Sequence, residues 1–106
     1  MTCVRFYRDS HGRLSGFSAI GHAGAGEKGE DIVCAGISVL TQTAVNALEA
    51  VAGIQVHPYI GDGYLSIRLP KGLDAKQRYD AQIILRTTQQ GLKDLALACP
   101  QYLRIS

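Results

Sequence analysis

The sequence predicts an α+β fold, a two-layer α/β sandwich in which two helices cover one face of a mostly antiparallel sheet. Short segments with apolar residues at alternate positions occur in pairs separated by turn residues, as in hairpins of half-buried strands. Each pair is followed by a longer segment in which apolar residues recur at helical spacing. The expected order of elements is therefore ββαββαβ.

The first hairpin begins with a strand in which Val4 and Phe6 alternate with their neighbours. Residues 9–12, Asp-Ser-His-Gly, have turn chemistry, and residues 14–20 read as the return strand. Gly16 inside that strand predicts a β-bulge.

The second hairpin is expected from a strand around residues 54–59, a turn at residues 61–63 and a further apolar strand. The apolar positions of that further strand are Leu65, Ile67 and Leu69. Pro58 has no N–H to donate, which places the first of these strands at an edge or a bulge. Residues 102–105 are predicted to form a last short strand.

Two helices are predicted between and after the hairpins. The first runs from Asp31 to about Val51 and stops near Gly53, and the second runs over residues 74–98 and ends before Pro100. The apolar stripe of the first helix is Val33, Ile37, Leu40, Ala44, Leu48 and Val51. The stripe of the second is Ala81, Ile84, Leu85, Thr88, Leu92, Leu95 and Ala96.

Length and composition restrict the class of protein. A chain of 106 residues predicts one domain over residues 1–106, long enough to bury a core. Its net charge of +2, with scattered Lys and Arg, predicts no direct nucleic-acid binding. No signal pattern and no apolar run of membrane-spanning length is evident, so no membrane partner is expected. Three cysteines imply no disulfide framework and favour the reducing cytoplasm. Cys3 and Cys99 are expected to pack rather than react.

A histidine and a cysteine flank a glycine-rich loop over residues 21–36. Asp31 is placed to cap the helix that follows the loop, which leaves Cys34 near the third helical position. A thiol attacks as its thiolate, and both a neighbouring imidazole and the N–H groups at a helix start favour that form. His22 and Cys34 are therefore the candidate reactive pair.

Other interpretations of this loop are weaker. Residues 24–29 match the GxGxxG pattern of dinucleotide sites, but a hairpin strand precedes them rather than a βαβ unit. A phosphate-binding loop would need a Gly-Lys-Ser/Thr ending. A metal site from His22, Asp31 and Cys34 lacks a fourth ligand at a familiar spacing, so no metal or cofactor is expected. A cysteine that is merely buried is the remaining alternative.

The motif Gly-His-Ala at residues 21–23, followed by Asp-Ile-Val-Cys-Ala at residues 31–35, resembles the ribosomal-processing cysteine protease family, Prp. Val45-Asn46-Ala47 and residues 81–85 also resemble that family. The resemblance implies a cytoplasmic, homodimeric thiol protease without a cofactor. Such a hydrolase removes the N-terminal extension of a large-subunit ribosomal protein during ribosome biogenesis. It also implies that His22 and Cys34 form the catalytic dyad.

The expected reaction is peptide-bond hydrolysis through an acyl-enzyme, with Cys34 as nucleophile and His22 as acid and base. Gly21, Ala35 and Ser38 are candidates for substrate or oxyanion contacts, with the Cys34 and Ala35 N–H groups as donors. Asp31 caps the helix or orients the histidine. The loop between the pair is expected to close over substrate. The alternatives are a non-catalytic ribosome-associated binding module and a thiol redox sensor.

Overall fold

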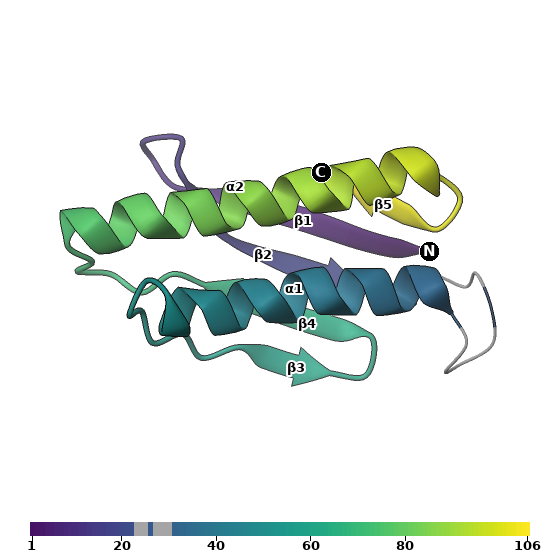
Figure 1. The fold of residues 1–106 in the computed structure, drawn as a ribbon, viewed down its shortest axis with the longest axis horizontal. Helices are drawn as coiled ribbons and strands as arrows, with labels where there is room; N and C mark the ends of the chain where they lie inside the picture. The colour runs from purple at the N-terminus through teal and green to yellow at the C-terminus, as the bar shows by residue number, and fades with distance from the viewer. Residues whose placement is uncertain (23–25, 27–30) are drawn as a thin grey trace.

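The computed structural model describes residues 1–22, 26 and 31–106, and these form two layers (Figure 1). One layer is a five-stranded sheet, and the other consists of two helices. The predicted ββαββαβ order is confirmed. The elements are β1 (Thr2–Arg8), β2 (Leu14–Ile20), α1 (Ile32–Ala50), β3 (Tyr59–Gly61), β4 (Tyr64–Arg68), α2 (Ala75–Ala98) and β5 (Leu103–Ile105).

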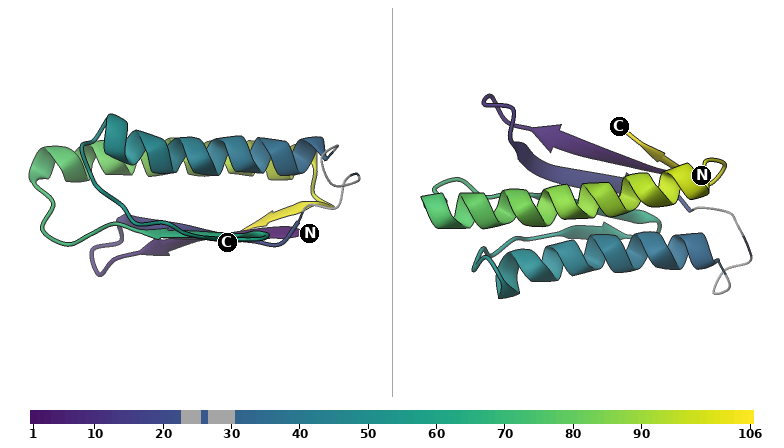
Figure 2. Two further views of the ribbon diagram at one scale, coloured as in Figure 1. Left: turned by 90° about the horizontal axis from the view of Figure 1, so that it is seen from below. Right: turned by 45° about the horizontal axis from the view of Figure 1, so that its top comes forward.

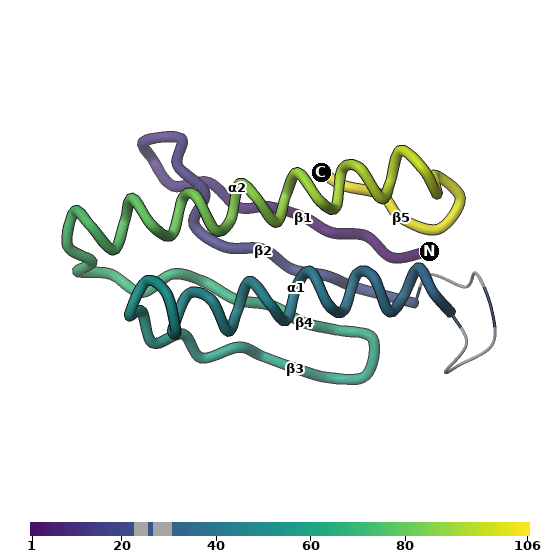
Figure 3. Tube along the Cα trace, in the orientation of Figure 1, coloured from purple at the N-terminus to yellow at the C-terminus, as the bar shows by residue number. Residues whose placement is uncertain are grey.

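The strands lie in the order β3-β4-β2-β1-β5. The pairs β1–β2, β2–β4 and β3–β4 are antiparallel, and β5 joins the other side of β1 in parallel. Figure 3 shows how the chain returns from α2 through a short turn to place β5 beside β1. The mostly antiparallel sheet predicted from the sequence is therefore confirmed.

Both helices lie on the same face of the sheet (Figure 2). Side chains that alternate along the strands fill the space between the layers, and Phe17, Ile67 and Leu85 are almost completely buried there. A second apolar cluster includes Val4, Ile37 and Leu92, under the first half of α1 and the second half of α2. The core therefore supports both ends of the helical layer.

Both helices begin at an aspartate that caps them. The Asp31 carboxylate accepts a hydrogen bond from the Cys34 N–H, and the Asp74 carboxylate accepts one from the Gln77 N–H. At Asp74 the Gln77 side chain also accepts from the cap's own N–H, which completes a capping box. These caps satisfy N–H groups that a helix start otherwise leaves unpaired.

Some expectations need correction. Residues 54–58 were predicted as a strand, but the strand there is confined to Tyr59–Gly61. Ile54 and Val56 are buried and their neighbours are exposed. The alternation therefore reflects burial of a segment that is not a strand of the sheet. Pro58, which cannot donate to a ladder, separates this segment from the edge strand β3.

Helix α1 and two side chains also differ from expectation. Contrary to the sequence reading, α1 is long and apolar enough to span a membrane by length and composition, with 19 residues and a mean hydropathy of 1.3. Its buried residues pack in the core described above.

Val51, expected in the buried stripe, is the exposed C-cap residue of α1. Cys3 is exposed rather than packed, because it points away from the helices.

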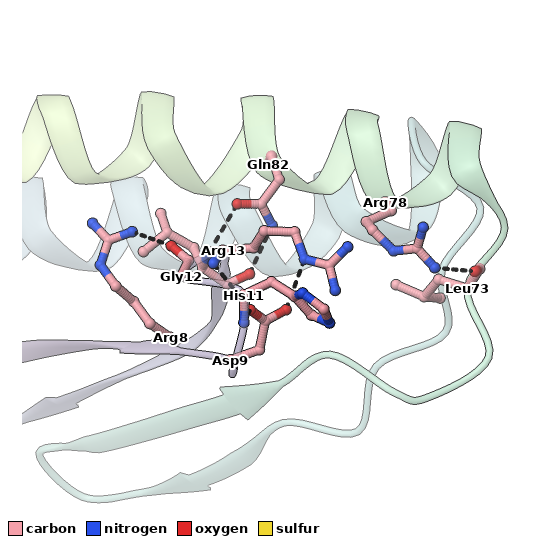
Figure 4. Close-up of polar contacts among 9 residues, drawn as sticks. Arg8, Asp9, His11, Gly12, Arg13, Leu73, Arg78 and Gln82 are labelled. Carbon is pink, nitrogen blue, oxygen red and sulfur yellow. Dashed lines mark hydrogen bonds and ion pairs between the residues drawn. The ribbon is translucent and has the colours of Figure 1, made fainter.

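The bulge predicted at Gly16 is confirmed. Tyr7 pairs with Gly16 and Arg8 pairs with Leu14, so one residue of β2 is left over in the ladder. Next to it, Gln82 of α2 reaches down to the start of β2 (Figure 4). Its side chain accepts a hydrogen bond from the Leu14 N–H at 2.9 Å and donates one to the Leu14 carbonyl at 2.7 Å. These two hydrogen bonds join the two layers at the end of the molecule opposite to the start of α1.

Candidate active site

A cavity of about 180 Å³ lies where β2 ends, α1 begins and the β3–β4 turn comes back towards the sheet. It brings together residues that are far apart in the sequence, His22 and Cys34 among them. Its lining residues are Thr2, Ala19, Gly21, His22, Cys34, Ile37, Ser38, Thr41, Gln42, Ile60, Gly61, Gly63, Tyr64 and Leu65. The two predicted catalytic residues therefore share one cavity.

Cys34 is the third residue of α1, as predicted. It is half-buried, since it packs against the apolar cluster of Val4, Ile37 and Leu92 on one side and lines the cavity on the other. The apolar contacts hold the side chain, and the cavity gives a substrate access to the sulfur. This border position suits a nucleophile.

His22 follows the last residues of β2 and is held by the β3–β4 turn. Its Nε2 lies 3.6 Å from Oδ1 of Asp62, and the side chains are 57% and 85% exposed, respectively. The His22 carbonyl accepts a hydrogen bond from the Met1 nitrogen at 2.7 Å. The His22 backbone is thus held by Met1, the residue before β1, and the ring lies next to a carboxylate from the β3–β4 turn.

Two glycines allow the chain to approach this closely. The Gly21 N–H donates to the Gly63 carbonyl at 2.7 Å, which joins the end of β2 to the β3–β4 turn. Both have positive φ, +100° and +64°, a region that side chains with a β-carbon rarely adopt. A β-carbon at Gly63 would lie 2.8 Å from Nε2 of His22. The position of the imidazole therefore depends on a glycine at residue 63.

The predicted oxyanion donors are already paired. The Cys34 N–H donates to the Asp31 carboxylate at 2.9 Å, and the Ala35 N–H donates to the Asp31 carbonyl at 3.0 Å. Ala35 lines a groove between α1 and α2 instead of the cavity. Neither N–H is available to an oxyanion in this conformation, whereas Gly21 and Ser38 do line the cavity. Asp31 acts as the predicted cap.

Sequence reasoning missed Thr2 and Asp62. Thr2 lines the cavity, and its hydroxyl is buried and has no hydrogen-bond partner among the described residues. A buried hydroxyl without a hydrogen-bond partner is costly. Asp62 was recognised only as part of a turn. Nothing in the sequence places residue 62 beside residue 22, because the contact requires β3 and β4 to pair.

Several expectations fall on residues 23–25 and 27–30, which lie outside the described residues. They include most of the closing loop and two glycines of the GxGxxG pattern, Gly24 and Gly29. Among residues 1–22, 26 and 31–106, no three His, Cys, Asp or Glu side chains are grouped to hold a metal ion. The described site thus presents a thiol and an imidazole in one cavity, the groups used in nucleophilic catalysis of acyl transfer.

Comparisons with known proteins agree with this chemistry. The ribosomal processing cysteine protease Prp of Bacillus subtilis (strain 168) is 37% identical over 81 residues, 74% of this chain and 72% of that protein. The crystal structure of an essential ribosomal processing protease Prp from S. aureus with a covalently linked product peptide has a TM-score of 0.89 at 28% identity. It covers 100% of this chain and 98% of that chain.

A second S. aureus Prp structure, in complex with a substrate peptide, has a TM-score of 0.84 at 27% identity, again covering 100% of this chain and 98% of that chain. The family model described as cysteine protease Prp matches residues 1–104. The chain therefore belongs to the cysteine protease Prp family and is a cysteine protease.

Proposed function

We propose that this protease removes the N-terminal extension of a large-subunit ribosomal protein, with His22 and Cys34 as its catalytic dyad. The observation that carries the proposal is the single cavity shared by these two side chains, which come from different elements. The names of the B. subtilis and S. aureus relatives support ribosomal processing, and the peptides bound to the S. aureus protease support a peptide substrate.

In the proposed reaction His22 takes the thiol proton, and the Cys34 sulfur attacks the carbonyl carbon of the scissile peptide bond. The tetrahedral intermediate collapses to a thioester as the C–N bond breaks, and His22 gives the proton to the leaving amine. A water molecule, deprotonated by His22, then attacks the thioester. Its collapse releases the new carboxylate and restores the thiol.

Other residues of the cavity position the substrate. Gly21 and Ser38, which line the cavity, contact the peptide. Asp62, beside Nε2 of His22, orients the imidazole so that its other nitrogen serves the reaction. An oxyanion contact to the Cys34 or Ala35 N–H would require the substrate to displace the bonds to Asp31.

We also propose that the protease acts in the cytoplasm as a homodimer and without a cofactor. All three cysteines are free, which agrees with a reducing compartment. An apolar groove of about 670 Å³ between α1 and α2 offers surface for a second copy, with Val39 at 65% exposure. Light scattering of the purified protein measures the oligomeric state.

Replacing Cys34 with alanine tests the proposal. The purified variant is incubated with a ribosomal protein carrying its N-terminal extension, and products are identified by mass spectrometry. We expect no cleavage, because the nucleophile is lost, with the fold retained because alanine suits a helix. Cys99→Ala is the matched control and should cleave, since Cys99 does not line the cavity.

The alternatives give different results. Cleavage by Cys34→Ala would remove Cys34 from the mechanism. If the protein keeps its ribosome-linked function after alkylation of Cys34, it is the binding module and not a protease that acts through this site. A redox sensor would instead need a resolving thiol, and neither Cys3 nor Cys99 lines the cavity.

A further inference from the structure

The face of the sheet turned away from α1 and α2 is covered by no described element (Figure 2). We call it the open sheet face. Val4, Ala19 and Leu65 are paired neighbours that point into the core, so the residues next to them along each strand point to the open side. The open sheet face therefore consists of Cys3, Arg5, Tyr7, Gly16, Ser18, Ile20, Tyr59, Tyr64, Ser66, Arg68 and Arg104.

This face is cationic although the chain is nearly neutral. Arg5, Arg68 and Arg104 project from three different strands, and all are exposed. The five strands together carry four arginines and no carboxylate, whereas the rest of the chain carries seven Lys and Arg and nine Asp and Glu. The positive charge is therefore concentrated on the sheet, and the remainder of the protein is slightly acidic.

Aromatic rings lie among these arginines. The Arg68 guanidinium lies 3.8 Å from the centre of the Tyr7 ring. Tyr59 and Tyr64 form an edge-to-face pair with ring centres 5.5 Å apart, and Tyr59 is 71% exposed. A ring so exposed on an edge strand makes few contacts within the protein and leaves its surface open to a partner.

We propose that the open sheet face binds single-stranded RNA. Arginines attract phosphates, and exposed rings on a sheet stack on unpaired bases, a combination used by single-strand binding proteins. A membrane or an acidic peptide would use the charge but offers no planar bases for the tyrosines. A second copy packed face to face would place the arginines of both copies against each other. The RNA therefore accounts for both features.

The proposal involves neither His22 nor Cys34 and departs from the expectation of no nucleic-acid binding. That expectation rested on a net charge of +2 averaged over the whole chain. The average conceals the separation of charge, because carboxylates in loops and helices offset arginines that the strand register gathers on one face. Binding RNA would keep the protease near RNA-containing particles.

The test measures fluorescence anisotropy of a labelled 12-nucleotide oligouridylate against the full-length protein at several salt concentrations. The triple variant R5Q/R68Q/R104Q should bind at least about 10-fold more weakly, and the slope of log affinity against log salt should fall by about 2, at roughly 0.7 per phosphate contact. The control K71Q/R86Q/K93Q removes the same charge elsewhere and should keep most of the affinity.

Two tyrosines of similar exposure test the stacking. Tyr59→Ala should weaken binding by about 5-fold to 150-fold, the range seen for loss of one stacked base. Tyr79→Ala is the control, since Tyr79 is 68% exposed but lies on α2. Phenylglyoxal modification of the unaltered protein provides a measurement without any variant, and RNA should protect Arg5 and Arg104 but not Arg86.

Several results would overturn the proposal. They are equal loss of affinity in the two triple variants, equal effects of the two tyrosine substitutions, or competition by polyglutamate as strong as that by unlabelled RNA. Absence of RNA protection at Arg5 and Arg104 would do so as well. Conversion of a dimer to a monomer by R5Q/R68Q/R104Q would instead assign the face to a second copy.

Discussion

The His22 imidazole lies against the backbone of Gly63, and this contact leaves no room for a larger residue. The turn residue Asp62 approaches the same ring from solvent. The position of the His22 ring therefore depends on two neighbours, Gly63 through its lack of a β-carbon and Asp62 through its carboxylate. Their contributions are separable by substitution.

Gly63→Ala should lower kcat by about 10- to 100-fold, because a β-carbon 2.8 Å from Nε2 displaces the ring and small misplacements are costly in catalysis. It should also cost about 1–2 kcal/mol of stability, because residue 63 has a positive φ. Gly72→Ala is the matched control. Gly72 has a φ of +79° and open space around its β-position, so its alanine variant should lose similar stability and no activity.

Asp62→Asn should lower kcat by about 2- to 5-fold with little change in KM, because an exposed ion pair contributes at most about 1 kcal/mol. Such an effect is expected of a residue that positions His22. Steady-state kinetics on a peptide substrate measure it, and Asp62→Glu should restore part of the loss. If kcat is the same in all three proteins, Asp62 does not position the histidine.

At the scale of the element, the start of α1 gives Cys34 its place. The cap bond from the Cys34 N–H to Asp31 holds the first turn, and the apolar residues Val33 and Ile37 fasten that turn to the core. An N-cap aspartate thus serves the candidate site indirectly, because it fixes the backbone that carries Cys34.

Asp31→Ala should lower the free energy of unfolding by about 0.5–2 kcal/mol, the usual cost of losing such a cap, and should also reduce kcat. Asp31→Asn retains an acceptor oxygen and should keep most of both. Asp74→Ala removes the corresponding cap of α2, which begins at the far end of the molecule, and should cost stability alone. Urea unfolding and peptide kinetics measure the two quantities; equal kcat losses at Asp31 and Asp74 would contradict a local role for the α1 cap.

At the scale of the whole molecule, the two layers are joined by the apolar core and, opposite to the cavity, by Gln82. Gln82→Leu should lower the free energy of unfolding by about 1–3 kcal/mol, because the N–H and the carbonyl of Leu14 both lose their hydrogen-bond partner. Gln90→Leu, in which an exposed contact to Asp94 is lost, should change stability by less than about 0.5 kcal/mol. Thermal unfolding measures both. Activity at low temperature should be unchanged in both variants, since neither position touches the cavity.

The sequence predicted most of the fold because its local signals agree with one another. The helix cap at Asp31, the start of the second helix near Asp74, the bulge at Gly16 and the alternation of the strands are all set by interactions between near neighbours. One exception was the segment before Pro58, in which burial without strand pairing produced the same alternation as a strand. Periodicity reports which side chains are buried and does not report which backbone groups are paired.

The sequence by itself determined the class of fold, the position of Cys34 in the first turn of α1 and the candidate pair with His22. It did so because each depends on spacing along the chain. The tertiary structure alone decided that Gly63 and Thr2 meet at the cavity and that Asp62 contacts His22. It also decided that three scattered arginines share one face of the sheet. These contacts join different strands and turns, and their positions follow from strand order and register, which residue spacing does not encode.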